Sequence, residues 1–278
     1  MRTQATAAGA TFAAALAGID WSRPWFQPFA AQGAALAAAV QGGADLRAAL
    51  DAQAAALDLR NARGLPLRFI AQHALPYGSA YEAHIHATGE VPTRDNLHDF
   101  FNALIWLHFP RAKRVLNQVQ AEVIAREGVR TMRGGVRDAA TLFDENAVLF
   151  LSADEELADA LKGFAWQRLF VDARAAWGAR CAVVPFGHAL LEKLVQPYKS
   201  VTAHAWTLPL APGQQALDAV LAESLQAAVR AGALRGGRSF APLPVMGIPG
   251  WCDDNAQPDF YADTTVFRAG RRRDQAPG

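Results

Sequence analysis

The chain has 278 residues, of which 51% are hydrophobic and 19% charged, so it is long and apolar enough to bury a real core. Its formal net charge of +1 gives no basic excess of the kind that nucleic-acid-binding domains usually carry. Two cysteines, Cys181 and Cys252, cannot make a disulfide framework and fit a reducing cytoplasm. No run approaches the roughly 20 apolar residues of a membrane helix. We therefore expect a cytoplasmic protein that is not membrane-bound and for which nucleic acid is not the expected partner; a small-molecule ligand or substrate is left unidentified.

The first part of the chain predicts helices that lead into two strands. Residues 19–30 place four aromatic side chains among two prolines, which indicates an irregular segment laid across a core. Apolar residues at helical spacing predict helices at about 30–41 and 44–58. Residues 65–72 and 80–88 have the character of strands.

The second of these expected strands, 80–88, alternates apolar and polar residues. In a strand, that alternation would place Glu82, His84 and His86 on one face. A carboxylate and two imidazoles at this spacing could bind a metal. A solvated strand face with no ligand is the alternative.

The stretch from Gly89 to Pro110 combines a helix start, an apolar stripe and several reactive side chains. Asp95 or Asn96 is expected to cap the helix, and Pro110 ends it. A second helix follows and ends at Gly128, and three cations near its start are expected on its solvent face: Arg111, Lys113 and Arg114.

Further along the chain, the pattern changes to alternating strands and helices. Residues 137–151 resemble two strands around an acidic turn, Asp144-Glu145-Asn146. Elements of β-α-β type are then expected: strands at 147–151, 181–186 and 201–208, and helices at about 153–177, 188–196 and 214–231.

These elements predict an α/β (or α+β) fold with a mixed sheet, flanking helices and an N-terminal helical portion. The division that we expect is a helical extension over 1–64 packed on the core, a main domain over 65–268 and a disordered basic tail over 269–278.

His188 is a candidate functional residue because it follows an apolar strand and starts a helix. Ligands of open α/β sheets bind beyond the carboxyl ends of strands, where helix N-termini point unpaired N–H groups at the site. Glu192 lies four residues on, hence on the same helix face, and could orient the imidazole or share a metal with it. A purely structural pair is the alternative.

His98 and Asp99 form a second candidate. An adjacent His-Asp pair resembles the metal-binding pair of HD-type phosphohydrolases, but the chain offers no clear partners for the rest of that set. Asp99 also has a plain structural role at the start of a helix, where it favours the helix dipole.

Together these residues predict a mixed nitrogen and oxygen site for zinc or manganese. The expected metal ligands are His98, His188, Glu192 and Asp144, with Glu145 as the alternative to Asp144. The expected catalytic set is His98, Asp99, His188 and Glu192, with Asn102 and Arg94 as donors that position a substrate.

Four segments resemble a proteobacterial family that is known as a domain of unknown function: VPTRDNLHDFFNALIWLHFPRAKRVLN, RDAATLFDEN, FGHALLEKLVQP and GIPGW. The resemblance covers about residues 65–268 and implies no activity, fold or ligand.

Among the functions considered, the sequence favours a metal-dependent hydrolase-type enzyme. The alternative is a non-catalytic binding or scaffold protein whose polar residues form a structural network. A second alternative, nucleic-acid binding through scattered arginines and the tail, is disfavoured by the balanced charge.

Overall fold

The computed structural model describes residues 11–128, 135–210 and 213–270. Residues 11–17 are helical, and short 3₁₀ and π turns connect several of the later elements. In chain order, the other helices and strands are α2 (Ala30–Gln41), α3 (Leu46–Ala56), β1 (Arg68–Ala71), α4 (Tyr81–Thr88), β2 (Glu90–Thr93), α5 (Leu97–His108), α6 (Pro110–Glu127), α7 (Gly135–Asn146), β3 (Ala147–Ser152), α8 (Glu155–Lys162), β4 (Cys181–Pro185), α9 (His188–Lys193), β5 (Thr202–Leu208), α10 (Gln214–Arg230) and β6 (Ala241–Pro244).

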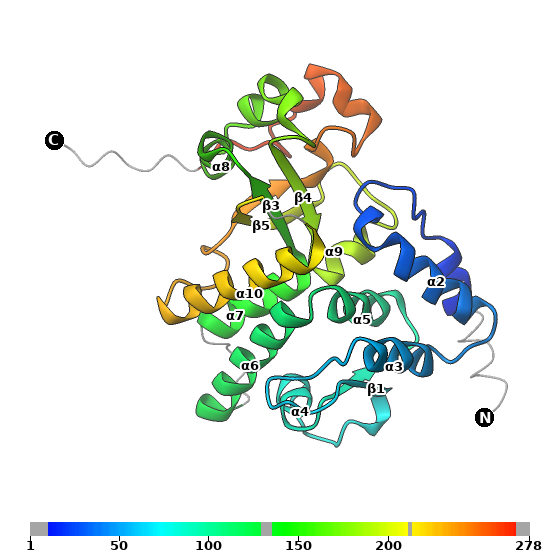
Figure 1. Ribbon diagram of the computed structural model, residues 1–278. Helices are drawn as coiled ribbons and strands as arrows, with labels where there is room; N and C mark the ends of the chain where they lie inside the picture. The colour runs from blue at the N-terminus through cyan, green and yellow to red at the C-terminus, as the bar shows by residue number, and fades with distance from the viewer. Residues whose placement is uncertain (1–10, 129–134, 211–212, 271–278) are drawn as a thin grey trace.

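A mixed four-stranded sheet has the order β4-β3-β5-β6. Strand β3 runs antiparallel to β4 and parallel to β5, and β5 runs antiparallel to β6. The fold is therefore mixed α/β with flanking helices, as the sequence predicts (Figure 1). Because β4 is antiparallel to β3, the segment between these two strands is not the parallel crossover that a β-α-β unit requires.

Helix α6 is central to the helical part of the molecule, because it packs against α4, α7 and α10. In Figure 1 these helices and α5 lie beyond one end of the four-stranded sheet. A small parallel sheet of β1 and β2 lies near α3 and α4. The aromatic segment before α2 is irregular, as expected, and buries Trp25, Phe26 and Phe29.

The strand expected at 80–88 is wrong, because these residues form helix α4. Ile85 is fully buried, and the helix ends at Gly89, whose φ of 79° is in the left-handed region that glycine favours. The Asn61 side chain donates to the Ile85 and His86 carbonyls and so satisfies the last turn. A short stretch of alternating apolar and polar residues is compatible with this helix, because most of its residues are partly buried.

The hairpin expected at 137–151 is also wrong. Residues up to Asn146 form α7, and β3 begins at the next residue. The buried positions Ala139, Ala140, Phe143 and Asp144 follow the spacing of a helix face. The acidic pair that resembled a turn therefore lies in the last turn of a helix that runs directly into a core strand.

Side chains from the N-terminal part, such as Leu16 and Trp25, belong to the same buried hydrophobic cluster as Phe150 of β3. Within the described ranges, no helix is long and apolar enough to cross a membrane. Of the expected basic tail, residues 271–278 lie outside the described residues.

Candidate metal centre

The start of α5 separates two neighbouring side chains. Asn96 is the N-cap, and its Oδ1 accepts a hydrogen bond from the Asp99 amide at 2.7 Å. The Asp99 carboxylate in turn accepts from the Arg94 amide and guanidinium. Asp95, the other expected cap, pairs with Arg47. Asp99 is thus engaged in the hydrogen bonds of the helix cap, whereas the His98 side chain contacts other residues.

Antiparallel pairing brings the end of α7 to the start of α9. Val148 of β3 lies opposite Pro185 of β4, and the amides of Phe186 and Gly187 both donate to the Ala147 carbonyl. In an antiparallel pair, the residues before one strand meet those after the other. Glu145 of α7 and His188 of α9 therefore come together, although they are 43 residues apart (188 − 145).

Gly187 permits this close approach. A Cβ atom at Gly187 would lie 2.5 Å from the Asn146 backbone and from the Glu145 carbonyl oxygen, which is too close for any side chain. Its φ of −63° is an ordinary value. Gly187 is therefore required because the backbone of α7 leaves no space for a side chain, and not for an unusual backbone conformation.

Three ligand atoms converge where α5, α7 and α9 meet. Nε2 of His98 lies 3.1 Å from Nε2 of His188, and Oε2 of Glu145 lies 3.9 Å from the first and 3.4 Å from the second. Metal–ligand bonds of about 2.0–2.2 Å arranged as a tetrahedron require ligand atoms about 3.3–3.6 Å apart. The triangle formed by His98, Glu145 and His188 is close to these dimensions. In the part of the chain that the structure describes, it is the one cluster of metal-ligating side chains.

The other ring nitrogens face carboxylates. Nδ1 of His98 lies 3.0 Å from Oε2 of Glu192, and because a carboxylate accepts, Nδ1 is the donor. With a proton on Nδ1, Nε2 can present a lone pair, which is the form of imidazole that binds metals. Nδ1 of His188 lies 3.8 Å from Oδ2 of Asp144, near enough for electrostatic orientation but beyond a hydrogen bond.

Burial sets the charge states around this triangle. The His188 side chain is 6% exposed, and burial lowers the pKa of its imidazole to about 4, so the ring is neutral at pH 7. Burial also raises the pKa of the Glu145 carboxyl, although its interaction with His98 opposes the shift. Burial alone would raise the pKa of the Asp144 carboxyl. The Lys113 ammonium and the His188 imidazole outweigh this effect of burial, so the pKa is lowered.

Lys113 is buried at the back of this site. Its side chain is 4% exposed, and its Nζ donates to both carboxylate oxygens of Asp144 at 2.6 and 2.8 Å. Nζ also donates to Oδ1 of Asn102 at 2.9 Å, and the Asn102 amide donates to the Tyr81 hydroxyl. The expectation that Lys113 lies on a solvent face is wrong, because its side of α6 is covered by α5 and α7.

The expected site residues fall into three groups. His98, His188 and Glu192 come together. The four-residue spacing predicts that Glu192 contacts His188, but in the structure it contacts His98.

The other expected residues have different partners. Asp144 pairs with Lys113, and its neighbour Glu145 supplies the converging oxygen. Asn102 faces Lys113 as part of a buried network. Asp99 and Arg94 bind each other, and the HD-type interpretation has no geometric support, because Asp99 is not among the converging side chains.

The polar residues of α4 do not form a second metal cluster. The Glu82 carboxylate accepts from the Asn117 side chain, and Nε2 of His84 lies 3.4 Å from Oε2 of Glu90. His86 is not in this pair. Cys181 is buried in β4, and burial raises the pKa of its thiol to about 11, so it stays protonated at neutral pH.

Residues 67–271 match a family described as "Protein of unknown function (DUF3025)". The chain belongs to this family. It matches no curated protein and no solved structure.

The DUF3025 match includes the three converging residues, their carboxylate partners and Lys113, and it begins after α3. The whole candidate metal centre therefore lies in the DUF3025 segment, and the N-terminal helices contribute no ligand to it.

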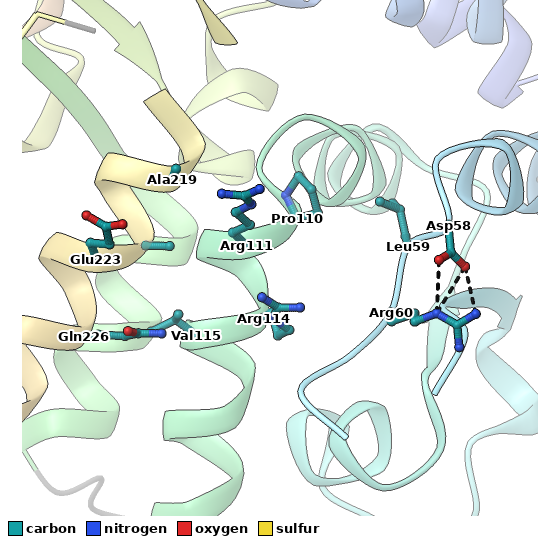
Figure 2. A pocket seen from close by; sticks show the side chains of 11 residues that line it. Asp58, Leu59, Arg60, Pro110, Arg111, Arg114, Val115, Ala219, Glu223 and Gln226 are labelled. Atoms are coloured by element: carbon teal, nitrogen blue, oxygen red, sulfur yellow. Dashed lines mark hydrogen bonds and ion pairs between the residues drawn. The ribbon is translucent and has the colours of Figure 1, made fainter. Parts of the chain in front are cut away.

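A surface groove of about 460 Å³ lies away from the metal triangle (Figure 2). Its walls come from α6, α10 and the segment after α3, and part of it lies outside the DUF3025 match. Arg111 and Arg114 of α6 and Glu223 of α10 line it, and Asp58 pairs with Arg60 at its edge. No member of the triangle lines this groove, so the groove and the convergent side chains are separate features.

Proposed function

We propose that His98, Glu145 and His188 bind one divalent transition metal, zinc or manganese, and that the protein is a hydrolase acting on a small molecule. The observation that carries the proposal is the convergence of two imidazole nitrogens and a carboxylate oxygen from three elements, at 3.1, 3.4 and 3.9 Å from one another. A divalent cation between these atoms would accept the lone pairs of both Nε2 atoms and one carboxylate oxygen.

Three protein ligands suit catalysis better than structure. Structural zinc sites are closed by four side chains, whereas catalytic sites keep a position for water or substrate. The side chains of His98 and Glu145 are 32% and 40% exposed, so solvent reaches the open side. A metal bound here would lower the pKa of its water ligand and make hydroxide available near neutral pH.

The surrounding residues would prepare this chemistry. Glu192 holds His98 in the tautomer that exposes Nε2, and burial keeps the His188 ring neutral. Without a metal, Nε2–H of His188 can donate to Nε2 of His98. For His188 to bind a metal through Nε2, its proton would lie on Nδ1, the nitrogen nearest Asp144.

The test is metal binding followed by activity. The purified chain, dialysed first against a chelator and then against buffer, is titrated with Zn²⁺ and Mn²⁺ by calorimetry. We expect about one metal per chain and hydrolysis of p-nitrophenyl acetate or bis(p-nitrophenyl) phosphate that is lost with chelator and regained with metal. A chain that binds neither metal contradicts the proposal.

The second candidate is a non-catalytic binding protein. The observation in its favour is the buried network of Tyr81, Asn102, Lys113 and Asp144, in which each contact crosses from one element to another. Stoichiometric metal without hydrolysis of any ester would favour this second function. A cytoplasmic location belongs to either proposal and is supported by two free cysteines.

A further inference from the structure

The structure presents two buried carboxylates against helix α6, and their partners differ in kind. Asp218 of α10 is 4% exposed and accepts from the amides of Arg111 and Ala112 in the first turn of α6. Asp144 of α7 is 7% exposed and is bound by the Lys113 ammonium. The first carboxylate caps a helix. The second lies against a buried charge, which has no such local function.

The Lys113 ammonium is fully engaged. Two of its hydrogen bonds go to Asp144 and one goes to Oδ1 of Asn102, all at 2.9 Å or less. An ammonium has three protons to donate, so these bonds fix its position. The Asn102 amide is fixed in turn by the Tyr81 hydroxyl at 3.0 Å. The Asp144 carboxylate is therefore held directly by Lys113 of α6, and Asn102 of α5 and Tyr81 of α4 fix Lys113 in turn.

Asp144 faces the one atom of the His188 ring that lacks a partner. Nδ1 of His188 is buried and has no hydrogen-bond partner among the described residues. The nearest carboxylate oxygen is Oδ2 of Asp144, at 3.8 Å. Metal-bound histidines almost always donate their other ring N–H to a carboxylate, a carbonyl or a water, which fixes the tautomer and the ring orientation.

We propose that Lys113 is a positioning residue of the metal centre: it holds the Asp144 carboxylate beside Nδ1 of His188, so that Nε2 faces the metal. This inference rests on the proposed function. Lys113 touches neither metal nor substrate and acts through Asp144. The two histidines would then be oriented alike, His98 by Glu192 and His188 by the pair of Asp144 and Lys113.

The test measures metal affinity and folding stability separately. Lys113→Met and Asp144→Asn are compared with Asp218→Asn, which weakens a buried carboxylate on the same helix without touching the site. The probe is Co²⁺, because its visible absorption reports the coordination geometry and its affinity can be measured by competition with a chelating dye. Thermal melts of the metal-free proteins are recorded alongside.

We expect Lys113→Met and Asp144→Asn to weaken Co²⁺ binding by about 10- to 100-fold and to change the absorption bands of the bound ion. Asp218→Asn should keep the wild-type affinity and spectrum, even where its melting temperature falls as much. Asn102→Ala, which removes one hydrogen bond from Lys113 and leaves the ion pair, should give a smaller loss of affinity and serves if Lys113→Met does not fold.

Wild-type affinity and spectrum in Asp144→Asn and in the folded Lys113 or Asn102 variant would overturn the positioning role and leave the metal site intact. If the wild-type protein binds no metal, the proposed function fails as well. The two failures are thus distinguishable.

Discussion

His98 and Asp99 are adjacent in the sequence, yet they belong to two polar clusters of opposite character. The cap cluster, Arg94, Asn96 and Asp99, is formed within six residues, and each carboxylate oxygen of Asp99 has an N–H donor. The partners of His98 come from positions 90 and 94 residues away. In the cap cluster, the Asp99 carboxylate has hydrogen-bond donors within the same short segment. The cluster around His98 instead brings together side chains that are distant in the sequence.

The two clusters also differ in their balance of donors and acceptors. In the cap cluster, a guanidinium balances a carboxylate, and the pair sits at the end of a helix where a capping network is expected. In the triangle of His98, Glu145 and His188, two imidazoles and a carboxylate from three elements converge. We propose that a metal binds between them, and four predictions test that proposal.

The largest effect is expected from removing a metal ligand. His98→Ala should weaken zinc binding more than 100-fold, because outer partners of ligands are already worth about 10- to 100-fold. The melting temperature of the metal-free protein should change little, since the His98 side chain is partly exposed. Asp99→Asn is the control at the next position. Equal affinities for His98→Ala and the wild type, measured by calorimetry, would remove His98 from the site.

A pH effect of similar size is expected in the metal-free protein. Burial lowers the His188 pKa from 6.5 to about 4, so the unfolded chain binds this proton first and stability is lost as the pH falls from 6.5 to 4. The change is about 3 kcal/mol at 1.36 kcal/mol per pKa unit.

Denaturant melts of the wild type and of His188→Gln at several pH values, with chelator present, measure this effect. The pKa values of His108 and His204 are also lowered by burial, so a shallower but non-zero slope is expected in the variant. Parallel profiles for the two proteins would contradict the assignment.

The next effect concerns the outer partner of His98. Glu192→Gln should weaken zinc binding about 10- to 100-fold, because an amide no longer selects the tautomer that exposes Nε2. Its side chain is 42% exposed, so little change in melting temperature is expected. Glu192→Asp, which keeps the charge but shortens the reach, should fall between the two. A zinc affinity unchanged by Glu192→Gln would mean that the contact does not orient His98.

The smallest effect belongs to the cap cluster. Asn96→Ala should lower the free energy of unfolding by about 1 kcal/mol, because the Asp99 amide loses its acceptor. Zinc affinity should be unchanged, and Asn96→Asp should retain the stability. A large loss of zinc binding in Asn96→Ala would show that the two clusters are not independent.

Long elements with clear ends are predictable from this sequence. The helix ended by Pro110, the helix after it and the apolar strand that includes Cys181 all lie where composition and caps indicate. Helix α4 and helix α7 are not predictable in this way, since short alternation and an acidic triplet fit strands and turns equally well. Their side chains are covered by neighbours that no local pattern reveals.

The site was partly visible for the same reason. The sequence indicates His98 and His188 because both lie near helix starts. For Glu145 it predicts a turn, and for Lys113 it predicts a solvent-exposed helix face. A signal for Lys113 did exist: Asn117 and Gln120, four and seven residues on, continue a polar line that is buried along α6. What the sequence lacks is the antiparallel register of β3 and β4, which alone sets Glu145 beside His188.

The separation of the three ligands along the chain has a consequence for folding. They are 47 and 43 residues apart (145 − 98 and 188 − 145), so an unfolded chain would have to close two long loops to bind the ion. A metal bound by this site would therefore select the folded chain and stabilise it by about 2.7 kcal/mol at a free concentration 100 times its Kd. The midpoint of thermal unfolding would then rise with the concentration of free metal.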